Sequence, residues 1–412
     1  MKTVCVIGLG YIGLPTSAML ASKGIKVIGV DVNENVVKTI NQGKIHIVEP
    51  ELENIVEKAT KEGYFYANLE PVEADVYIIA VPTPFTDHKK PDLKYVEEAA
   101  SSIAKVVKQG NLVILESTSP VGTTERVANV IFSKRPELNL DNLNLAFCPE
   151  RVLPGKIIHE LTNNNRIIGG LSQSATEKAK ELYQIFVKGE IVLTDARTAE
   201  LAKLTENAFR DVNIAFANEL SLICEKLNID VWNLIELANK HPRVNILQPG
   251  PGVGGHCIAV DPWFIVDSNP NEARLIRSAR EINDSRPAWV VNHVTQMCQT
   301  TNCSKLAFWG LAYKNDIDDL RESPAVEIVK EFADSNKQVE CLVVEPNIKD
   351  LPAMLMSPNI RLCTVQDALI ESSIIVILVN HKEFYFINPE DYPKISFMDF
   401  KGILERKSNV NK

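Results

Sequence analysis

The residues with the clearest chemical potential lie in a glycine-rich stretch, residues 249–262, with the sequence PGPGVGGHCIAVDP. Its glycines are Gly250, Gly252, Gly254 and Gly255. They permit positive φ angles and a close approach of the backbone to a ligand, so the stretch can present Cys257 on a tight loop. Such a cysteine is a candidate nucleophile that forms an acyl adduct, and Asp261 could then take a proton or hold a water. A lone cysteine is more often a small buried apolar residue, so this interpretation depends on the elements around the loop.

A long helix is predicted before this loop. Residues 197–227 contain neither Gly nor Pro, and their apolar residues recur at three- and four-residue spacings, which indicates one amphipathic helix. The helix is too long for one small domain to cover, so we expect it to span two domains and to offer a face to a second subunit. Lys203 and Asn207 lie one turn apart on one side of it. Such a pair is usually solvated, but the neighbouring alanines make this side closely approachable.

The N-terminal residues contain the parts of a dinucleotide site. A buried strand at 3–7 leads into G-x-G-x-x-G, and a helix and a second strand that ends on Asp31 follow. The fingerprint residues are Gly8, Leu9, Gly10, Tyr11, Ile12 and Gly13. The glycines let the backbone reach a pyrophosphate, the helix N-terminus favours its charge, and Asp31 could bind the ribose hydroxyls. Because an acid here would repel a 2′-phosphate, NAD is favoured over NADP.

Loops after the next strands carry further candidates. Strands predicted at 76–81 and 112–116 run into segments rich in small hydroxyl residues and proline, which contain Thr83 and Thr118. Ligands of an open α/β sheet bind beyond the carboxyl ends of the strands, so both threonines are candidate contacts to a cofactor or a water. Ordinary turn chemistry would explain them equally well. Glu150 and Arg151 follow another short strand and belong to the same rim.

A second α/β pattern occupies the C-terminal part of the chain. Strands are predicted at 305–309, 338–344 and 373–379, after a helical stretch at 271–298. The full G-x-G-x-x-G is missing, which implies a different ligand or none. Lys314 and Arg321, on the loop after the first of these strands, could clamp a diphosphate.

The predicted fold is therefore α/β, with two Rossmann-like doubly wound domains joined by a long central helix. We expect an NAD-binding domain at 1–195, a central helical dimerisation region with the cysteine loop at 196–298, and a second α/β domain of the nucleotide-binding type at 299–412.

The composition excludes several classes of protein. With 412 residues, 45% apolar and 24% charged, the chain is long enough for two or three domains. Its net charge of −9 includes no run of Lys or Arg, which argues against nucleic acid or an anionic membrane as a partner. Neither a secretory signal nor a membrane-spanning run is present, so we expect a cytoplasmic protein. The cysteines are scattered without a CxxC pair, so no disulfide framework and no metal site are predicted.

Six motifs in this order resemble those of the UDP-glucose/GDP-mannose 6-dehydrogenase family, over nearly the whole chain. They are Gly8-x-Gly10-x-x-Gly13, Ser117-Thr118-Ser119-Pro120, Cys148-Pro149-Glu150-Arg151, residues 199–209, Gly254-Gly255-His256-Cys257 and Arg321-Glu322-Ser323-Pro324. Residues 149–155 (PERVLPG) and 241–245 (HPRVN) are similar to the members that act on UDP-N-acetylhexosamines. The resemblance implies four-electron oxidation of the C6 alcohol to the uronate with NAD, in a homodimer. UDP-N-acetyl-D-mannosamine is the favoured substrate, with UDP-N-acetylglucosamine or UDP-glucose as the alternative.

The resemblance also implies roles for single residues. Cys257 would form a thiohemiacetal and then a thioester, while Lys203 and Asn207 would stabilise the oxyanion. Asp261 and Thr118 would position water, and Glu150 would lie near the sugar and the hydrolytic water. Further implied contacts to cofactor, sugar or nucleotide are those of Tyr11, Ile12, Thr83, Arg151, Gly254, Lys314, Arg321 and, toward a neighbouring subunit, Arg243.

The chemistry of these residues agrees with that activity. After the first hydride leaves, the aldehyde must be held while a second hydride leaves, and a thiolate adduct supplies that hold. A single-step NAD-dependent hydroxyacid dehydrogenase would need the lysine but no cysteine, so Cys257 argues against this alternative. A non-catalytic nucleotide-binding protein would not need Lys203, Asn207, Cys257 and Asp261 together.

Overall fold

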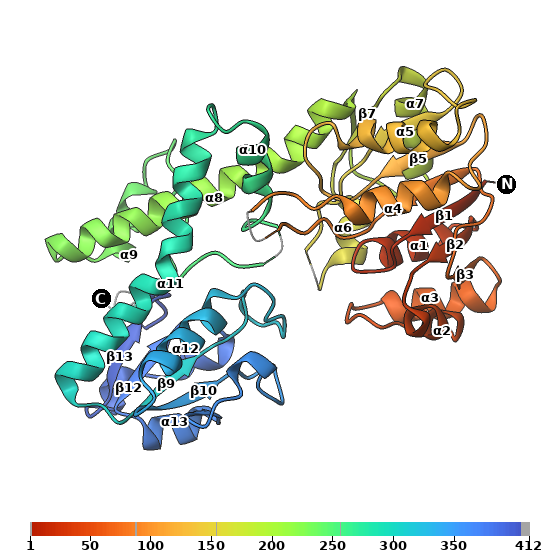
Figure 1. Ribbon diagram of the computed structural model, residues 1–412. Coiled ribbons are helices and arrows are strands. Elements are labelled where there is room, and N and C mark those ends of the chain that lie inside the picture. The colour runs from red at the N-terminus through yellow and green to blue at the C-terminus, as the bar shows by residue number, and fades with distance from the viewer. Residues whose placement is uncertain (1, 87–88, 154, 256, 405–412) are drawn as a thin grey trace. The chain divides into compact units, whose positions relative to one another are not determined.

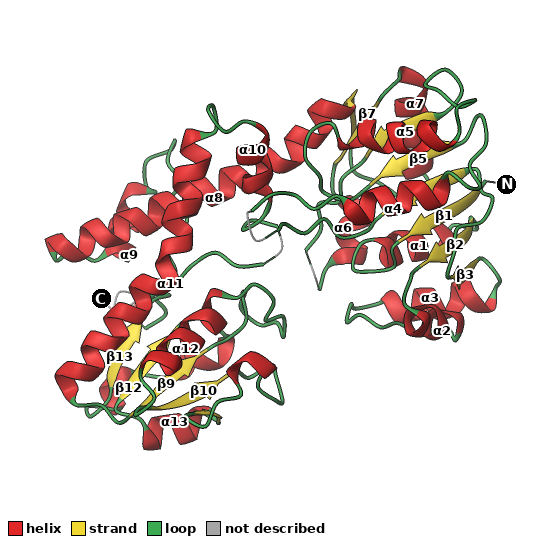
Figure 2. Cartoon of the chain, viewed as in Figure 1, coloured by secondary structure: helices red, strands yellow, loops and turns green. Residues whose placement is uncertain are grey.

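The computed structural model describes residues 2–86, 89–153, 155–255 and 257–404 (Figure 1). The chain divides into two compact units, Met1–Glu206 and Asn207–Lys412. Each unit contains one sheet with helices against it (Figure 2). Among the described residues, no helix is long and apolar enough to cross a membrane.

The first unit is built on an eight-stranded sheet with the order β3-β2-β1-β4-β5-β6-β7-β8. Its strands are β1 Thr3–Ile7, β2 Lys26–Val30, β3 Phe65–Asn68, β4 Val76–Ile79, β5 Leu112–Leu115, β6 Asn144–Phe147, β7 Arg166–Gly170 and β8 Ile191–Asp195. Its helices are α1 Gly13–Ser22, α2 Glu34–Asn41, α3 Leu52–Lys61, α4 Lys94–Ile103, α5 Thr123–Lys134, α6 Ile157–Asn163 and α7 Gln173–Tyr183. All neighbouring strands are parallel except β6 and β7. The order reverses between β1 and β4, and at such a switch point the carboxyl ends of the strands leave a crevice for a ligand.

The alternation of side chains along β1 explains the layers. Val4 and Val6 belong to a core shared with α1, α3, α6 and α7, whereas Cys5 and Ile7 belong to a second core shared with α4 and α5. A strand that is buried on both faces needs apolar residues at every position, and this is the continuous run that the sequence shows.

The second unit has a five-stranded parallel sheet with the order β11-β10-β9-β12-β13. Its strands are β9 Lys305–Trp309, β10 Glu340–Val344, β11 Ile360–Leu362, β12 Ile374–Ile377 and β13 Ser396–Asp399. Its helices are α9 Val231–Ala238, α10 Asp261–Ser268, α11 Arg274–Thr301, α12 Pro324–Ser335 and α13 Val365–Glu371, with 3-10 turns at Ala353–Leu355, Lys382–Phe386 and Pro389–Asp391. The predicted strands of this unit and its long helix after the cysteine loop are confirmed, with shifts of a few residues at their ends.

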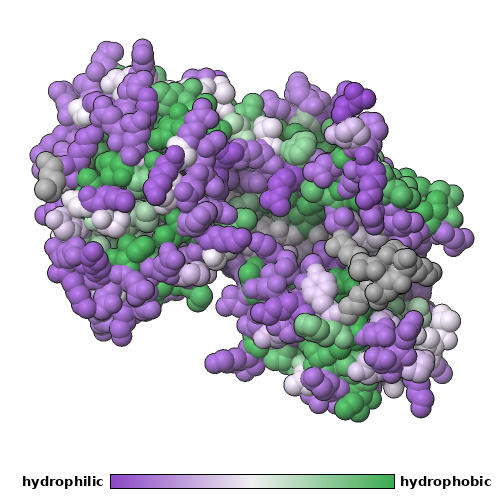
Figure 3. All heavy atoms as spheres, turned by 180° about the vertical axis from the view of Figure 1, so that it is seen from behind, coloured by the Kyte–Doolittle hydropathy of each residue, from purple (hydrophilic) through white to green (hydrophobic). Residues whose placement is uncertain are grey.

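The predicted central helix is confirmed as α8, Ala196–Leu227, a continuous helix of 32 residues that crosses the division between the two units. Large apolar side chains remain exposed along it, namely Leu201, Phe209, Phe216, Ile223 and Leu227. Figure 3 shows a surface that is mainly hydrophilic and is interrupted by apolar patches.

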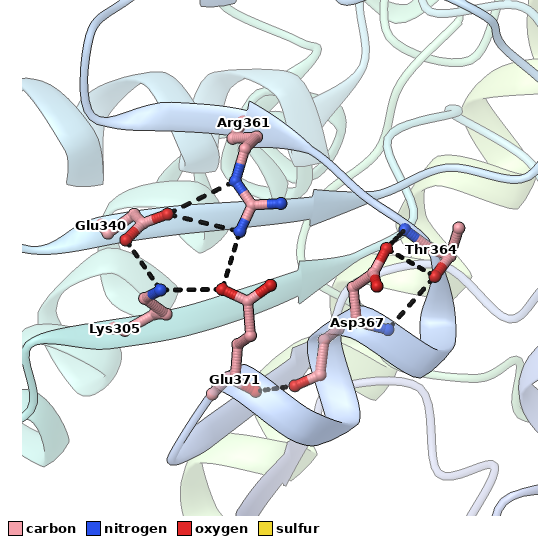
Figure 4. A network of polar contacts seen from close by, with 8 residues as sticks. Lys305, Glu340, Arg361, Thr364, Asp367 and Glu371 are labelled. Carbon is pink, nitrogen blue, oxygen red and sulfur yellow. Dashed lines mark hydrogen bonds and ion pairs between the residues drawn. The ribbon is translucent and has the colours of Figure 1, made fainter.

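An ionic network joins three strands of the second sheet, β9, β10 and β11, near their amino ends (Figure 4). Lys305 opens β9 and lies 2.9 Å from Glu340 of β10 and 2.8 Å from Glu371 of α13. Arg361 of β11 completes the network at 2.9 Å from Glu371. Thr364 and Asp367 form a capping box at the start of α13. Because ligands bind at the opposite, carboxyl ends of parallel strands, we assign this network to the stability of the sheet.

Candidate active site

The glycines of the N-terminal fingerprint do three different things. Gly8 has φ +93°, and a Cβ there would lie 2.5 Å from the carbonyl oxygen of Ala80. A Cβ at Gly13 would lie 1.8 Å from the carbonyl oxygen of Gly8, so α1 packs directly on the turn. A Cβ at Gly10, in contrast, would meet no atom within 4 Å. Packing within the chain therefore explains Gly8 and Gly13 but not Gly10, whose missing side chain leaves room for a ligand such as a pyrophosphate.

Asp31 is held at the carboxyl end of β2 and faces this turn. Its Oδ2 accepts a hydrogen bond from the backbone N–H of Leu9 (3.0 Å), and its Oδ1 accepts one from Asn33 (2.9 Å). The residue is half-buried, beside Val32, which is 94% exposed. No side chain caps the N-terminus of α1, which leaves this end of the helix dipole for an anion. The turn, the helix end and the fixed carboxylate match the needs of a dinucleotide.

The structure brings Thr83 and Thr118 together. The Thr83 hydroxyl donates to the carbonyl oxygen of Thr118 (2.5 Å), so the loops after β4 and β5 are joined at the carboxyl edge of the sheet. The hydroxyl of Ser117 reinforces this link by donating to the carbonyl oxygen of Val81 (2.6 Å). Thr83 therefore has a structural role in addition to any contact with a cofactor. Tyr11 and Ile12, also predicted contacts, lie on the adjoining turn and are partly exposed.

Glu150 and Arg151 lie after β6 and are held differently. Glu150 is 8% exposed, and its Oε2 accepts from Arg166 Nη2 at 2.5 Å. The side chain of Arg151 pairs with Glu206 of α8 (2.7 Å) and also donates to the carbonyl oxygen of Asn165 (3.1 Å). The predicted contact between Arg151 and a substrate would thus compete with an existing ion pair.

Glu200 anchors the start of α8 and was not among the predicted residues. Its carboxylate accepts from the backbone N–H groups of Gly122 (2.6 Å) and Thr124 (2.8 Å) and from the Thr124 hydroxyl (2.7 Å). It therefore caps α5, whose own N-cap residue Gly122 has no side chain to do so. Burial raises the pKa of Glu200 despite these hydrogen bonds. The contact fixes the turn of α8 that precedes Lys203.

Lys203 and Asn207 are each 8% exposed, so they do not form a solvated stripe. The side-chain amide of Asn207 donates to Oδ2 of Asp261 (2.6 Å), and Asp261 is 3% exposed. The backbone N–H of Asp261 in turn donates to the carbonyl oxygen of Cys257 (2.9 Å), and Cys257 is exposed. The structure thus joins three predicted catalytic residues, Asn207, Cys257 and Asp261, within the second unit. His256 lies outside the described residues.

A buried polar network supports the start of the cysteine loop. The backbone N–H of Gly250 donates to Oδ1 of Asn218 in α8 (2.9 Å), and its carbonyl oxygen accepts from Nε of Arg286 in α11 (3.1 Å). Asn218 also donates to Asn283 of α11 (2.8 Å). Burial lowers the pKa of Arg286 to about 10. None of these side chains was predicted from the sequence, because a polar residue inside a helix gives no signal of its burial.

The end of the cysteine loop packs on the loop after β9. A Cβ at Gly254 would lie 2.4 Å from the carbonyl oxygen of Glu322, and Gly255, at φ +83°, would place one 2.9 Å from the ring of Tyr313. These two glycines are therefore required by close packing inside the second unit. The predicted substrate contact of Gly254 stays a prediction beside this structural role.

The two residues predicted to clamp a diphosphate differ in their surroundings. Lys314 is exposed, whereas Arg321 donates to Asp319 through Nε (2.8 Å) and Nη2 (2.6 Å). A ligand at Arg321 would have to share or displace this bidentate pair. Arg243, predicted to reach a neighbouring subunit, is exposed after α9. Within the described parts of the chain, no group of three or more His, Cys, Asp or Glu residues could hold a metal ion.

Comparisons with known proteins indicate one and the same family over nearly the whole chain. Models of the UDP-glucose/GDP-mannose dehydrogenase family match residues 2–187 as its NAD-binding domain, 197–285 as its central domain and 307–406 as its UDP-binding domain. The chain is 58% identical to UDP-N-acetyl-D-mannosamine dehydrogenase of Campylobacter jejuni, over 92% of this chain and 96% of that protein. It is 52% identical to NDP-N-acetyl-D-galactosaminuronic acid dehydrogenase of Ralstonia nicotianae, over 98% and 97% of the two chains. The solved structure of UDP-D-ManNAc dehydrogenase from Pyrococcus horikoshii covers 97% of this chain and 96% of its own, with TM-score 0.87 and 39% identity.

Proposed function

Because this chain belongs to the UDP-glucose/GDP-mannose dehydrogenase family, we propose that it oxidises the C6 alcohol of UDP-N-acetyl-D-mannosamine to the uronate. The chain is an oxidoreductase with NAD as its cofactor. The overall reaction consumes one water and two NAD⁺ for each alcohol and gives one carboxylate, two NADH and three protons. The observation that carries the proposal is the connection of Asn207, Asp261 and the exposed Cys257 in one cluster.

The cluster supports the following roles for the cofactor and the residues in the reaction. When bound, NAD would supply the hydride acceptor for each of the two oxidations. The Cys257 sulfur adds to the aldehyde of the first oxidation, and the resulting thiohemiacetal can lose a second hydride to give a thioester. Water would cleave the thioester, and the buried Asp261 carboxylate, which accepts a hydrogen bond from Asn207, would orient that water. Lys203 and Asn207 would stabilise the oxyanion, an effect of roughly 3–4 kcal/mol for one well-placed donor.

The remaining predicted contacts belong to the same proposal. Gly8, Gly10, Gly13, Asp31 and Thr118 would hold the cofactor, and the exposed Lys314 would meet the nucleotide of the sugar substrate. We retain the predicted division into an NAD-binding domain at 1–195, a central region at 196–298 and a UDP-sugar domain at 299–412. A homodimer is proposed because α8 exposes Phe209 (67%) and Phe216 (50%), which a second subunit could cover. A cytoplasmic location remains part of the proposal.

The substrate is tested by parallel turnover assays with UDP-N-acetylmannosamine, UDP-N-acetylgalactosamine, UDP-N-acetylglucosamine and UDP-glucose. The galacto sugar is included because the Ralstonia relative is named for a galactosaminuronic acid. We expect the highest kcat/KM with UDP-N-acetylmannosamine and two NADH per sugar. A higher value with one of the other three sugars would reassign the substrate.

The role of Cys257 is tested by Cys257→Ser, which replaces the thiol by a hydroxyl of similar size that is a much poorer nucleophile and leaving group. We expect the variant to bind both substrates and to lose at least about a hundredfold in turnover. Mass spectrometry of the stopped reaction should then show an adduct on residue 257 or a released aldehyde. Near wild-type production of the uronate would exclude Cys257 as the nucleophile.

A further inference from the structure

A cluster of charged side chains is buried behind Glu150 in the first unit. Its other members are Arg166, the first residue of β7, and Glu116, which follows β5. Arg166 is 3% exposed and Glu116 is 2% exposed. The roles that family resemblance assigns to single residues include Glu150 but neither of these two. Because burial of a charge is costly unless it is paired, two such side chains next to a proposed catalytic residue require an explanation.

The distances show that the Arg166 guanidinium lies closer to the carboxylate of Glu150 than to that of Glu116. Arg166 Nη2 lies 2.5 Å from Oε2 of Glu150, whereas Arg166 Nη1 lies 3.8 Å from Oε1 of Glu116. The second oxygen of Glu150 accepts from the backbone N–H of Arg151 (2.6 Å). Both oxygens of Glu150 are therefore held from the protein side, and Arg166 supplies the side-chain partner that fixes the plane of the carboxylate.

Glu116 has partners of its own. Its Oε1 accepts from the Tyr183 hydroxyl of α7 (2.5 Å), and its Oε2 lies 3.3 Å from the Thr16 hydroxyl of α1. A hydroxyl can donate or accept, so the Thr16 contact suits either protonation state of Glu116. The remaining group on this side is the Cys148 thiol, 3.6 Å from Arg166 Nη1, and burial raises its pKa to about 12. The cluster thus contains one cation and two carboxyl groups.

The cluster has one more carboxyl group than it has cations, and Glu116 is the carboxyl group whose charge changes near neutral pH. Burial, with the neighbouring charge of Glu150 acting in the same direction, raises the pKa of Glu116 to about 7, although Arg166 opposes the rise. Burial is the largest single influence on Arg166 and opposes its charge, but Glu150, Cys148, Tyr183 and Glu116 together outweigh burial and raise the pKa of Arg166 well above its usual value. Near neutral pH the guanidinium therefore stays charged while Glu116 changes its charge.

From this geometry we propose that Arg166 is a positioning residue that fixes the Glu150 carboxylate for the oxidation, and that Glu116 competes with Glu150 for the same guanidinium. The inference rests on the proposed function, in which Glu150 lies near the sugar and the hydrolytic water. When Glu116 is ionised it attracts Arg166, and the hold on Glu150 weakens.

Arginine suits this place better than lysine would. Its planar fork presents separate N–H groups to Glu150 and toward Glu116, and its face lies over the ring of Tyr183 at 4.6 Å. A lysine keeps the charge, but as a single point on a flexible chain it cannot meet both carboxyl groups in the same geometry. Arg166→Lys therefore removes the alignment while it retains the buried positive charge.

A double-mutant cycle tests the proposal with the full-length enzyme. Glu150→Gln, Arg166→Lys and the double variant are compared with wild type for kcat and for KM of NAD and of the UDP-sugar. We expect Arg166→Lys to lower kcat by at least about tenfold with the KM of NAD changed less than about twofold. Since Arg166 acts through Glu150, the double variant should be no slower than Glu150→Gln by more than about twofold. Arg135→Lys, in which an ion-paired arginine of the same unit changes at the amino side of the sheet, is the matched control and should retain wild-type kcat.

The outcomes distinguish a failure of the role of Arg166 from a failure of the proposed role of Glu150. If the losses of the two single variants multiply in the double variant, Arg166 acts independently of Glu150 and the inference is wrong. If Glu150→Gln has wild-type kcat, the proposed role of Glu150 fails first, and the inference fails with it. Should Arg166→Lys not fold, as judged by circular dichroism and NAD binding, Glu116→Gln provides the second test. The ratio of its kcat to that of wild type should rise as the pH passes about 7, and a constant ratio from pH 6 to 8.5 would overturn the competition.

Discussion

Replacement of Glu116 by glutamine should make the stability of the protein less dependent on pH. Glutamine preserves the shape of the side chain and can keep both contacts of Glu116. Its carbonyl oxygen can accept from the Tyr183 hydroxyl and its amide can donate to Thr16, the two groups that Glu116 meets at 2.5 and 3.3 Å. The substitution therefore removes the titration of a fully buried carboxyl group and leaves the packing around it unchanged.

The magnitude follows from the pKa of Glu116, which is raised from 4.5 to about 7, mainly by burial. The unfolded chain releases this proton near pH 4.5, whereas the folded protein keeps it until about pH 7. Between these values the folded state binds more protons, so its stability falls as the pH rises. The full difference is about 3 kcal/mol. It is absent below pH 4.5, where both states are protonated, and complete above pH 7.

Chemical denaturation of wild type and Glu116→Gln at several values between pH 5 and 8 measures this difference. We expect the variant to be close to wild type at pH 5 and more stable by up to about 3 kcal/mol at pH 8. Glu57→Gln is the control, because Lys61 lowers the pKa of the exposed Glu57 and its titration therefore lies below this range. A difference between Glu116→Gln and wild type that stays constant from pH 5 to 8 would refute the reasoning about the buried cluster.

Three further predictions concern other parts of the chain. Asp31→Ala should raise the KM for NAD by roughly tenfold or more, since hydrogen bonds to a charged acceptor are lost. In the wild-type protein, a kcat/KM with NADP equal to that with NAD would contradict the assignment of Asp31. The wild-type protein should have the mass of a homodimer or larger by light scattering and Phe216→Asp should weaken that assembly, whereas a fully active wild-type monomer would exclude the dimer. Thr364→Ala should lower the free energy of unfolding by about 1 kcal/mol, through loss of the capping box of α13, and an unchanged denaturation midpoint would show that the cap contributes nothing.

The sequence predicted most of the inner strands of both sheets because their segments are nearly continuous apolar runs, but it did not predict β7, whose sequence RIIGG begins with Arg166 and ends in two glycines. Strands at the edges were missed, since only part of each is buried. In β3 every second residue is buried, and in β8 and β13 no residue is fully buried. Helix α10 was missed for the opposite reason. Its residues from Asp261 to Val266 are all buried, so the segment has no polar face and no helical periodicity.

The candidate site could be predicted where chemistry depends on residue type and local spacing. The fingerprint with Asp31, and the pair Cys257 and Asp261, belong to this kind. Residues that support them could not be found in this way, because their partners are distant in sequence. Arg166 meets Glu116, 50 positions earlier, and Arg286 meets Gly250, 36 positions earlier. A buried cation has no local pattern that distinguishes it from an exposed one.

A comparison of the two sheets explains why the second one takes a different ligand. The turn after β9 repeats the turn after β1. The N–H of Gly310 donates to the carbonyl oxygen of Val344 at 2.8 Å, as that of Gly8 does to Val30. Likewise the N–H of Leu311 donates to Glu345 at 2.7 Å, the counterpart of the contact between Leu9 and Asp31 at 3.0 Å.

The acids in these two equivalent places have different surroundings. Glu345 is 4% exposed, and its Oε2 also accepts from the N–H of Ala312 (3.0 Å) and lies 2.9 Å from His381 Nε2. The N–H of Asp316 donates to Nδ1 of this histidine (2.9 Å), which assigns the ring proton to Nε2 and makes His381 a donor to Glu345. Hydrogen bonds from His381 and the turn outweigh burial and keep the pKa of Glu345 low. The Glu345 carboxylate thus accepts its hydrogen bonds from groups of the protein. Asp31, in contrast, remains available to ribose hydroxyls. We therefore expect a nucleotide at the second sheet to be recognised by the loop that His381 fixes, which carries Lys314, and not by the acid at the end of the second strand.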